Sequence, residues 1–163
     1  MKSFVAKEAN RRGESCEKGE GVPQDFVKAV KYWRWAAALG DAKAQLNLGG
    51  ALFAGKGVQV DRAQAVNWWR KAAAQGVAEA QLNLGEAYER GQGVPADQAM
   101  AVEWWRKAAE KGLPLAQYNL GVAHFVGNGV PVDKPKAVSL WRKAAEKGLA
   151  LAQYNLGVVH FEG

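Results

Sequence analysis

The residues with the widest chemical range in this sequence are its two histidines, His124 and His160. An imidazole can bind a metal ion or act as a general base near neutral pH. Neither histidine has a cysteine or aspartate nearby at the spacing of a metal site. At the same position of a 36-residue repeat, described below, stand Tyr88 and Leu52. We therefore interpret both histidines as substitutes for core or half-buried side chains.

The other reactive groups fit no catalytic or cofactor pattern. Cys16 is the only cysteine, which excludes an internal disulfide and a zinc site of the usual spacing. Strings such as Gly91-Gln92-Gly93 follow predicted helices rather than strands, so they are not dinucleotide loops. The sequence also shows no Ser-His-Asp or Cys-His set. It therefore predicts a protein that is not an enzyme and needs no metal or cofactor.

Two repeated residue types could instead contact a ligand. Asparagines form a ladder at positions 47, 83, 119 and 155, and buried amides need hydrogen bonds. We expect this ladder to tie adjacent helices together rather than to touch a ligand. The pairs Trp68-Trp69 and Trp104-Trp105 could stack on sugars or bases only if they are exposed. We expect Trp69 and Trp105 in the core, and Trp68 and Trp104 against the adjacent repeat.

A 36-residue repeat must position all of these residues. Glycine, tryptophan, alanine and aspartate recur at intervals of 36 residues. Examples are Gly40, Gly76, Gly112 and Gly148, and Trp33, Trp69, Trp105 and Trp141. One such repeat cannot bury its apolar face alone, so neighbouring repeats must stack. The period predicts one all-α domain over residues 1–163. Its parts are a degenerate first repeat (1–40), three full repeats (41–76, 77–112 and 113–148) and a half repeat (149–163).

Each full repeat is predicted to hold two helices, at about 42–54 and 62–75 in the first of them. Ala44, Leu48, Ala51 and Leu52 form the apolar stripe of the first helix, and Ala65, Trp69 and Ala72 that of the second. Gly55 is placed to end the first helix, because glycine readily adopts the left-handed conformation. Asp61 is placed to cap the second helix, with Gln64 completing a capping box.

The pattern resembles the Sel-1-like repeat family, which is related to the tetratricopeptide repeats. The resemblance covers about residues 19–163 and rests on the matching residues Ala80, Leu84-Gly85, Tyr88, Gly91, Gly93-Val94, Asp97, Ala101, Trp105, Ala108-Ala109 and Gly112. It implies a right-handed α-solenoid that acts as a non-enzymatic adaptor for protein complexes. Some members act in bacterial signalling or at the host interface.

The resemblance leaves two other functions open. A cysteine-rich branch of the family is linked to penicillin binding, which would make the chain a penicillin-binding or hydrolytic enzyme. That branch has a cysteine pair in each repeat, and this chain has none. Residues 106–127 and 142–163 differ at only three positions, which also fits a designed or consensus-like array without a natural partner.

The two ends depart from the repeat. The segment around Arg11 and Arg12 places charge where later repeats have core residues, so the first repeat is either a polar end cap or frayed. Phe4, Val5, Ala6 and Ala9 could still dock. The half repeat at the other end lacks a second helix. We expect its apolar side chains to form an interface, so that the chain is either a fragment of a longer array or a protomer that self-associates through this end.

The resemblance places the partner on the first helices of the repeats. The side chains that would face a partner protein or peptide vary between repeats and are Leu46, Phe53, Leu82, Glu86, Glu89, Tyr118, Val122, Phe125, Tyr154, Val158 and Phe161. This face is predicted to be apolar and aromatic toward the C-terminus, with an acidic step in the middle. Aromatic groups are common interface anchors.

Charge and hydropathy restrict the remaining partners. The formal net charge is +6, but lysines and arginines stand beside acidic residues in every repeat, so we expect no nucleic-acid partner. No stretch is apolar enough to span a membrane, and the N-terminus lacks a signal peptide. We expect a cytoplasmic protein or, if the chain is trimmed, a periplasmic or secreted one.

Overall fold

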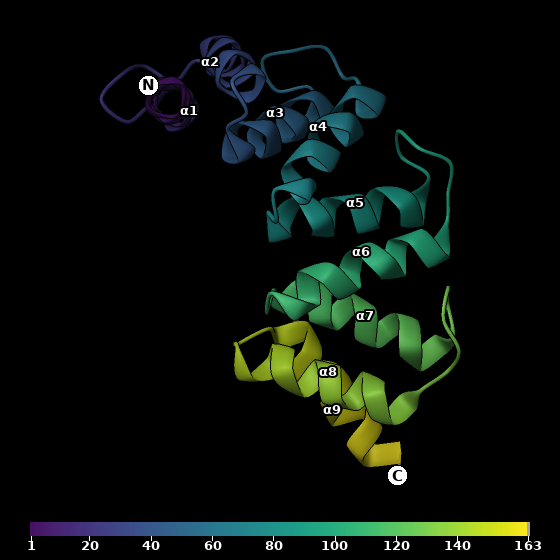
Figure 1. The fold of residues 1–163 in the computed structure, drawn as a ribbon. Coiled ribbons are helices and arrows are strands. Elements are labelled where there is room, and N and C mark those ends of the chain that lie inside the picture. The colour runs from purple at the N-terminus through teal and green to yellow at the C-terminus, as the bar shows by residue number, and fades with distance from the viewer. Residues whose placement is uncertain (163) are drawn as a thin grey trace. The chain divides into compact units, whose positions relative to one another are not determined.

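The computed structural model describes residues 1–162, including the side chains of residues 1–159. Within this range the chain is helical and has no strands (Figure 1). The helices are α1 (Lys2–Lys18), α2 (Phe26–Ala38), α3 (Ala42–Ala54), α4 (Arg62–Ala74), α5 (Ala78–Arg90), α6 (Gln98–Glu110), α7 (Pro114–Val126), α8 (Lys134–Glu146) and α9 (Ala150–Glu162). The predicted all-α architecture of helix-turn-helix repeats is confirmed.

Contacts divide the helices between two compact units, which are described separately. The N-terminal unit holds residues 1–80 and 92–94, and the C-terminal unit holds residues 81–91 and 95–163. In the N-terminal unit α2 packs against both α1 and α3, and α3 packs against α4. In the C-terminal unit α7 packs against α6 and α8, and α8 packs against α9. The helices that pack in this way are neighbours in the chain, as stacked repeats require.

The helices begin and end close to the predicted positions. Asp61 accepts a hydrogen bond from the Gln64 amide at 2.9 Å, and Gly55 ends α3 with a φ of 74°. The second helix of this repeat ends at Ala74, one residue earlier than predicted, with Gln75 as its C-cap. The reciprocal half of the predicted capping box is absent, because the Asp61 amide donates to the Leu52 carbonyl at 2.9 Å. That bond ties the loop back to α3.

A glycine beneath each core tryptophan sets how closely the two helices of a repeat approach. A Cβ added at Gly49 would lie 2.4 Å from Cδ1 and Nε1 of Trp69. The Trp69 indole therefore rests directly on the α3 backbone, and its Nε1 donates to the Leu46 carbonyl at 3.3 Å. The same close approach recurs in the pairs Gly13–Trp33, Gly85–Trp105 and Gly121–Trp141. The predicted apolar stripes of α3 and α4 are buried around this contact.

The first helix of the degenerate first repeat, α1, is continuous. Ala6 and Ala9 are buried as predicted, but Phe4 is 76% exposed and does not dock. Phe4 lies two residues before Ala6, and two residues turn a helix by about 200°, which places them on different faces. Arg12 does not occupy the core either, because it is exposed and pairs with Glu8 at 3.1 Å. The charge of Arg12 therefore lies outside the packed face, and α1 is helical from Lys2 to Lys18.

Candidate functional site

The first helices of the C-terminal unit carry two adjoining hollows. One, of about 360 Å³, lies over α5 and α7 and includes Glu86, Glu89 and Leu115 in its lining. The other, of about 420 Å³, lies over α7 and α9. Both are lined by Tyr118, Val122 and Val126. These shared side chains make one groove out of the two hollows, which we call the α5–α9 groove.

The aromatic walls of the α5–α9 groove rest on a fixed tryptophan. Trp141 of α8 is 2% exposed, and its Nε1 donates to the Tyr118 carbonyl at 3.2 Å. The ring centroids of Phe125 and Trp141 lie 5.2 Å apart, and those of Tyr118 and Trp141 lie 6.5 Å apart. Tyr118 and Phe125 are half-buried, so each keeps part of its surface on the groove. Rings held in this way lose little conformational freedom when a ligand binds.

The α9 side of the groove is the most open. Tyr154 is 71% exposed and Val158 is 39% exposed, and both line the second hollow. The predicted site residue Phe161 lies outside the residues whose side chains are described. The groove therefore joins five of the predicted partner-binding residues of α7 and α9: Tyr118, Val122, Phe125, Tyr154 and Val158.

Leu82 takes a different place from the one predicted. It is only 8% exposed and packs in the core with Val102, Trp105 and Leu120. It lies one helical turn before Glu86 on α5. Leu82 therefore offers little surface to a partner and acts mainly in packing.

The remaining predicted residues, Leu46 and Phe53, belong to the N-terminal unit. Both are half-buried. The Phe53 ring lies 5.1 Å from that of Trp69, and the Arg62 guanidinium lies 5.3 Å from the Phe53 centroid. A cation of the chain itself thus covers part of this ring.

Two acidic residues, Glu86 and Glu89, line the α5 end of the groove, as predicted. Glu86 is half-buried, and burial raises the pKa of its carboxyl group. The Arg90 charge opposes this rise and the neighbouring Glu89 charge adds to it. Glu89 lies 3.7 Å from Arg90, and the Arg90 side chain is 61% exposed whereas that of Glu89 is 36% exposed. Glu86 has no hydrogen bond or ion pair with another described residue.

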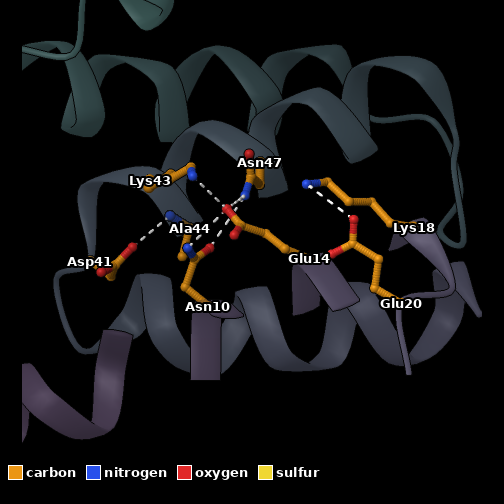
Figure 2. A network of polar contacts seen from close by, with 8 residues as sticks. All are labelled: Asn10, Glu14, Lys18, Glu20, Asp41, Lys43, Ala44 and Asn47. Carbon is orange, nitrogen blue, oxygen red and sulfur yellow. Dashed lines mark hydrogen bonds and ion pairs between the residues drawn. The ribbon is translucent and has the colours of Figure 1, made fainter. Parts of the chain in front are cut away.

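A polar network in the N-terminal unit was missed by the sequence analysis. Figure 2 shows the Glu14 carboxylate of α1 between Asn10, Lys43 and Asn47. The Lys43 Nζ lies 2.9 Å from Glu14 Oε1, and the Asn47 amide donates to Asn10 at 3.2 Å and to Glu14 at 3.4 Å. Asn47 thus ties α3 to α1, as predicted for the asparagine ladder. Glu14 and Glu86 share one repeat position, at which Gly50 stands in the repeat between them. A carboxylate that occurs twice at this position is the signal that could have pointed to the network.

A second repeated amide was also missed. Gln45 and Gln117 are buried, and each donates to a backbone carbonyl eight residues earlier, at 3.3 Å. Gln153 makes the same bond, to Ala145. These glutamines tie the start of α3, α7 and α9 to the end of the second helix that precedes each of them. Their 36-residue spacing was visible in the sequence.

The repeat geometry agrees with the comparison to known families. A model of the Sel1 repeat matches residues 9–41, 42–77, 78–113, 114–149 and 150–163. The chain belongs to the Sel1 repeat family. Proteins built from Sel1 repeats are generally protein-interaction scaffolds. A comparison with curated proteins finds no match.

Solved Sel1 repeat structures are similar to most of this chain. A protective antigen of uropathogenic Escherichia coli with an SLR fold is 35% identical over 95% of this chain and 33% of its own, with a TM-score of 0.91. A Sel1 repeat protein from Oxalobacter formigenes is 36% identical over 93% of this chain and 62% of its own, with a TM-score of 0.88. This chain therefore spans about one third and three fifths of those proteins.

A cysteine-rich relative gives a useful contrast. Helicobacter pylori cysteine rich protein B is 25% identical over 82% of this chain and 96% of its own, with a TM-score of 0.65. The Sel1 repeats of this chain contain one cysteine, Cys16, which is buried with a free thiol. The fold of this chain is therefore held by packing and hydrogen bonds rather than by disulfides.

The other chemically versatile residues of this Sel1 repeat chain are buried or half-buried where their side chains are described. His124 is 7% exposed, in agreement with a core role, and His160 lies outside the residues whose side chains are described. Trp68 and Trp104 are half-buried, and the Lys71 and Lys107 ammonium groups lie 4.1 Å and 4.2 Å from their ring centroids. Those ring faces are thus occupied by the chain itself.

Among the described side chains, no group of three or more His, Cys, Asp or Glu residues is placed to hold a metal ion. In the part of the chain that the structure describes, no helix is long and apolar enough to cross a membrane.

Proposed function

We propose that the α5–α9 groove binds a peptide segment of a partner protein, and that this chain works as a non-enzymatic scaffold. The observation that carries the proposal is the pair of adjoining hollows joined by Tyr118 and Val122. Together they form a concave apolar surface, which is the usual shape of a peptide or ligand site. Tyr118 and Phe125, placed on the buried Trp141, supply anchors of the kind that dominate binding energy.

The groove residues differ from the core in a way that supports binding. The core tryptophans and alanines recur in every repeat, whereas the residue at the groove position of Val122 is Gly50 in one repeat and Glu86 in another. The recurrence of the core residues follows from packing that is similar in each repeat. The variation at the groove position is consistent with a role in recognition.

Selection from a library of displayed 15-residue peptides tests the proposal. We expect peptides with aromatic or aliphatic side chains to be enriched, and Tyr154→Ala to weaken their binding by at least about tenfold in fluorescence anisotropy. Trp35→Ala is the matched control, because Trp35 is an exposed aromatic residue (50%) on the second helix α2. Equal affinity for both variants would contradict the proposal.

Self-association through the same face is a distinguishable outcome. If a second copy of the chain occupies the groove, light scattering will detect species heavier than 17.6 kDa at tens of micromolar. Tyr154→Ala would then reduce that mass, and peptide binding would compete with it. A single 17.6 kDa species at every concentration would leave the peptide as the occupant.

A further inference from the structure

Glu14 and Glu86 occupy the same position in repeats that lie 72 residues apart. Each lies on a first helix, and each is partly buried. The residues around Glu14 and Glu86 can therefore be compared position by position within the 36-residue repeat. The comparison shows what a carboxylate at this position needs and which of its partners Glu86 lacks.

Glu14 is satisfied from within the chain. The Lys43 ammonium lies 2.9 Å from it, and the amides of Asn10 and Asn47 donate at 3.2 Å and 3.4 Å (Figure 2). Burial raises the pKa of Glu14, but the hydrogen bond and charge of Lys43 and the two amides outweigh it and lower the pKa overall. This carboxylate is therefore kept ionised by a cation from the next first helix.

Two of the three equivalent positions around Glu86 hold apolar residues. Leu115 stands at the position equivalent to Lys43, and Leu82 stands at the position equivalent to Asn10. The third position holds an amide, Asn119, but no hydrogen bond joins it to Glu86. Leu115 and Asn119 both line the same hollow as Glu86. The carboxylate therefore faces a hollow of about 360 Å³ that is lined by apolar groups such as Leu115 and by polar groups that include Arg90, and a cation from a ligand has room there.

Arg90 does not replace the missing cation. It is 61% exposed and lies 3.7 Å from the Glu89 carboxylate. No ion pair joins it to Glu86, and burial still raises the pKa of Glu86 despite the Arg90 charge. A half-buried carboxylate without a paired cation is unfavourable, and a charge-assisted hydrogen bond from a ligand would remove much of that penalty.

We propose that the α5–α9 groove selects a peptide with a lysine or arginine whose charged group binds Glu86, beside an apolar side chain that packs on Tyr118 and Val122. The cation takes the place beside Glu86 that the Lys43 ammonium takes beside Glu14. Asn119 supplies the polar group that orients it. This inference rests on the proposed function, because it specifies the chemistry of the peptide that the groove binds.

Placing the missing lysine back into the chain tests the inference. Leu115→Lys copies the Glu14–Lys43 pair and should weaken the binding of a selected basic peptide by about tenfold, because the Glu86 carboxylate is then already paired. Leu151→Lys is the matched control. It adds the same charge to the lining of the same hollow, one repeat later, where Val122 rather than Glu86 occupies the facing position. We expect it to weaken binding less than about threefold, since it lacks the carboxylate partner.

The probes are a library-selected peptide and a synthetic copy in which its basic residue is replaced by glutamine. Glu86→Gln should reduce the affinity of the first by about tenfold and leave the second unchanged, because only the first offers a charge to pair. Selected peptides without basic residues would overturn the inference, as would equal effects of Leu115→Lys and Leu151→Lys. In either case a loss of binding in Tyr154→Ala would show that the proposed function still holds.

A measurement without any peptide checks the geometry. In carbon-detected NMR titrations, Leu115→Lys should lower the pKa of Glu86, as Lys43 does for Glu14, and Leu151→Lys should lower it less. An unchanged pKa of Glu86 in Leu115→Lys would show that position 115 does not face the carboxylate. The inferred location of the cation would then be wrong.

Discussion

The contact between Gly49 and Trp69 predicts opposite effects for the same substitution at two adjacent positions. Alanine stabilises a helix interior over glycine by about 0.5–1 kcal/mol, because it restricts the unfolded chain. At Gly50 nothing lies within 4 Å of an added Cβ, so Gly50→Ala should gain this amount. At Gly49 the added Cβ would lie 2.4 Å from the Trp69 ring, which must move.

The cost at Gly49 exceeds the helix gain. Overpacking of a well-packed core costs about 1–3 kcal/mol. The Trp69 ring cannot shift without lengthening its hydrogen bond to the Leu46 carbonyl, which is 3.3 Å long and contributes about 1 kcal/mol. Subtracting the helix gain, we expect Gly49→Ala to lower the free energy of unfolding by about 1–3 kcal/mol.

Urea unfolding and thermal unfolding, both followed by circular dichroism at 222 nm, compare the stability of each variant with that of the parent chain. A difference of 1 kcal/mol corresponds to about 2–4 °C in the unfolding temperature of a chain of this size, which is well resolved. The two variants differ by one position on one helix, so each controls for the other. If Gly49→Ala is as stable as Gly50→Ala, the close packing of Trp69 on the α3 backbone is wrong.

Three further predictions concern the N-terminal unit. Because the folded state lowers the pKa of Glu14, its contribution to stability is present above the unfolded pKa of about 4.3 and is lost as the pH falls through the folded pKa. Glu14→Gln should therefore make the unfolding free energy fall less steeply in acid urea titrations, and equal slopes would contradict this. Asp61→Ala should cost about 1 kcal/mol in urea unfolding through loss of the α4 cap, whereas Asp61→Asn should retain most of it. Phe4→Ala should change the unfolding midpoint little, since the ring is 76% exposed, and a loss above about 1 kcal/mol would show that Phe4 docks after all.

The helices and their core were predictable because the repeat multiplies every local signal. Alanine and tryptophan at fixed spacing, with aspartate before the helix and glycine after it, predicted α3 over the residues it occupies and α4 to within one residue. The error at Gln75 has a local cause, since Gln75 is a C-cap whose backbone no longer follows the helix. The 36-residue repeat aligns Arg12 with the core residue Leu48. The repeat alone does not tell whether a neighbouring helix covers the face of α1 that carries Arg12.

The groove was predictable only in part. Spacing assigns Tyr118 and Phe125 to one face of α7 and Tyr154 to the equivalent face of α9, and the three residues line one hollow. Leu82 obeys the same spacing and is nevertheless buried, because its exposure depends on how α5 packs in the C-terminal unit. The contrast between Glu14 and Glu86 depends on the side chains of two different helices, so it required the structure.

The most direct test of the groove is an amide chemical-shift titration of the whole chain with the tightest library-selected peptide. We expect the largest shifts at Glu86, Leu115, Tyr118, Val122 and Tyr154, with the second helices α6 and α8 affected less. Shifts concentrated on α2 and α4, with the α5–α9 groove unchanged, would contradict the assignment of this surface as the binding site.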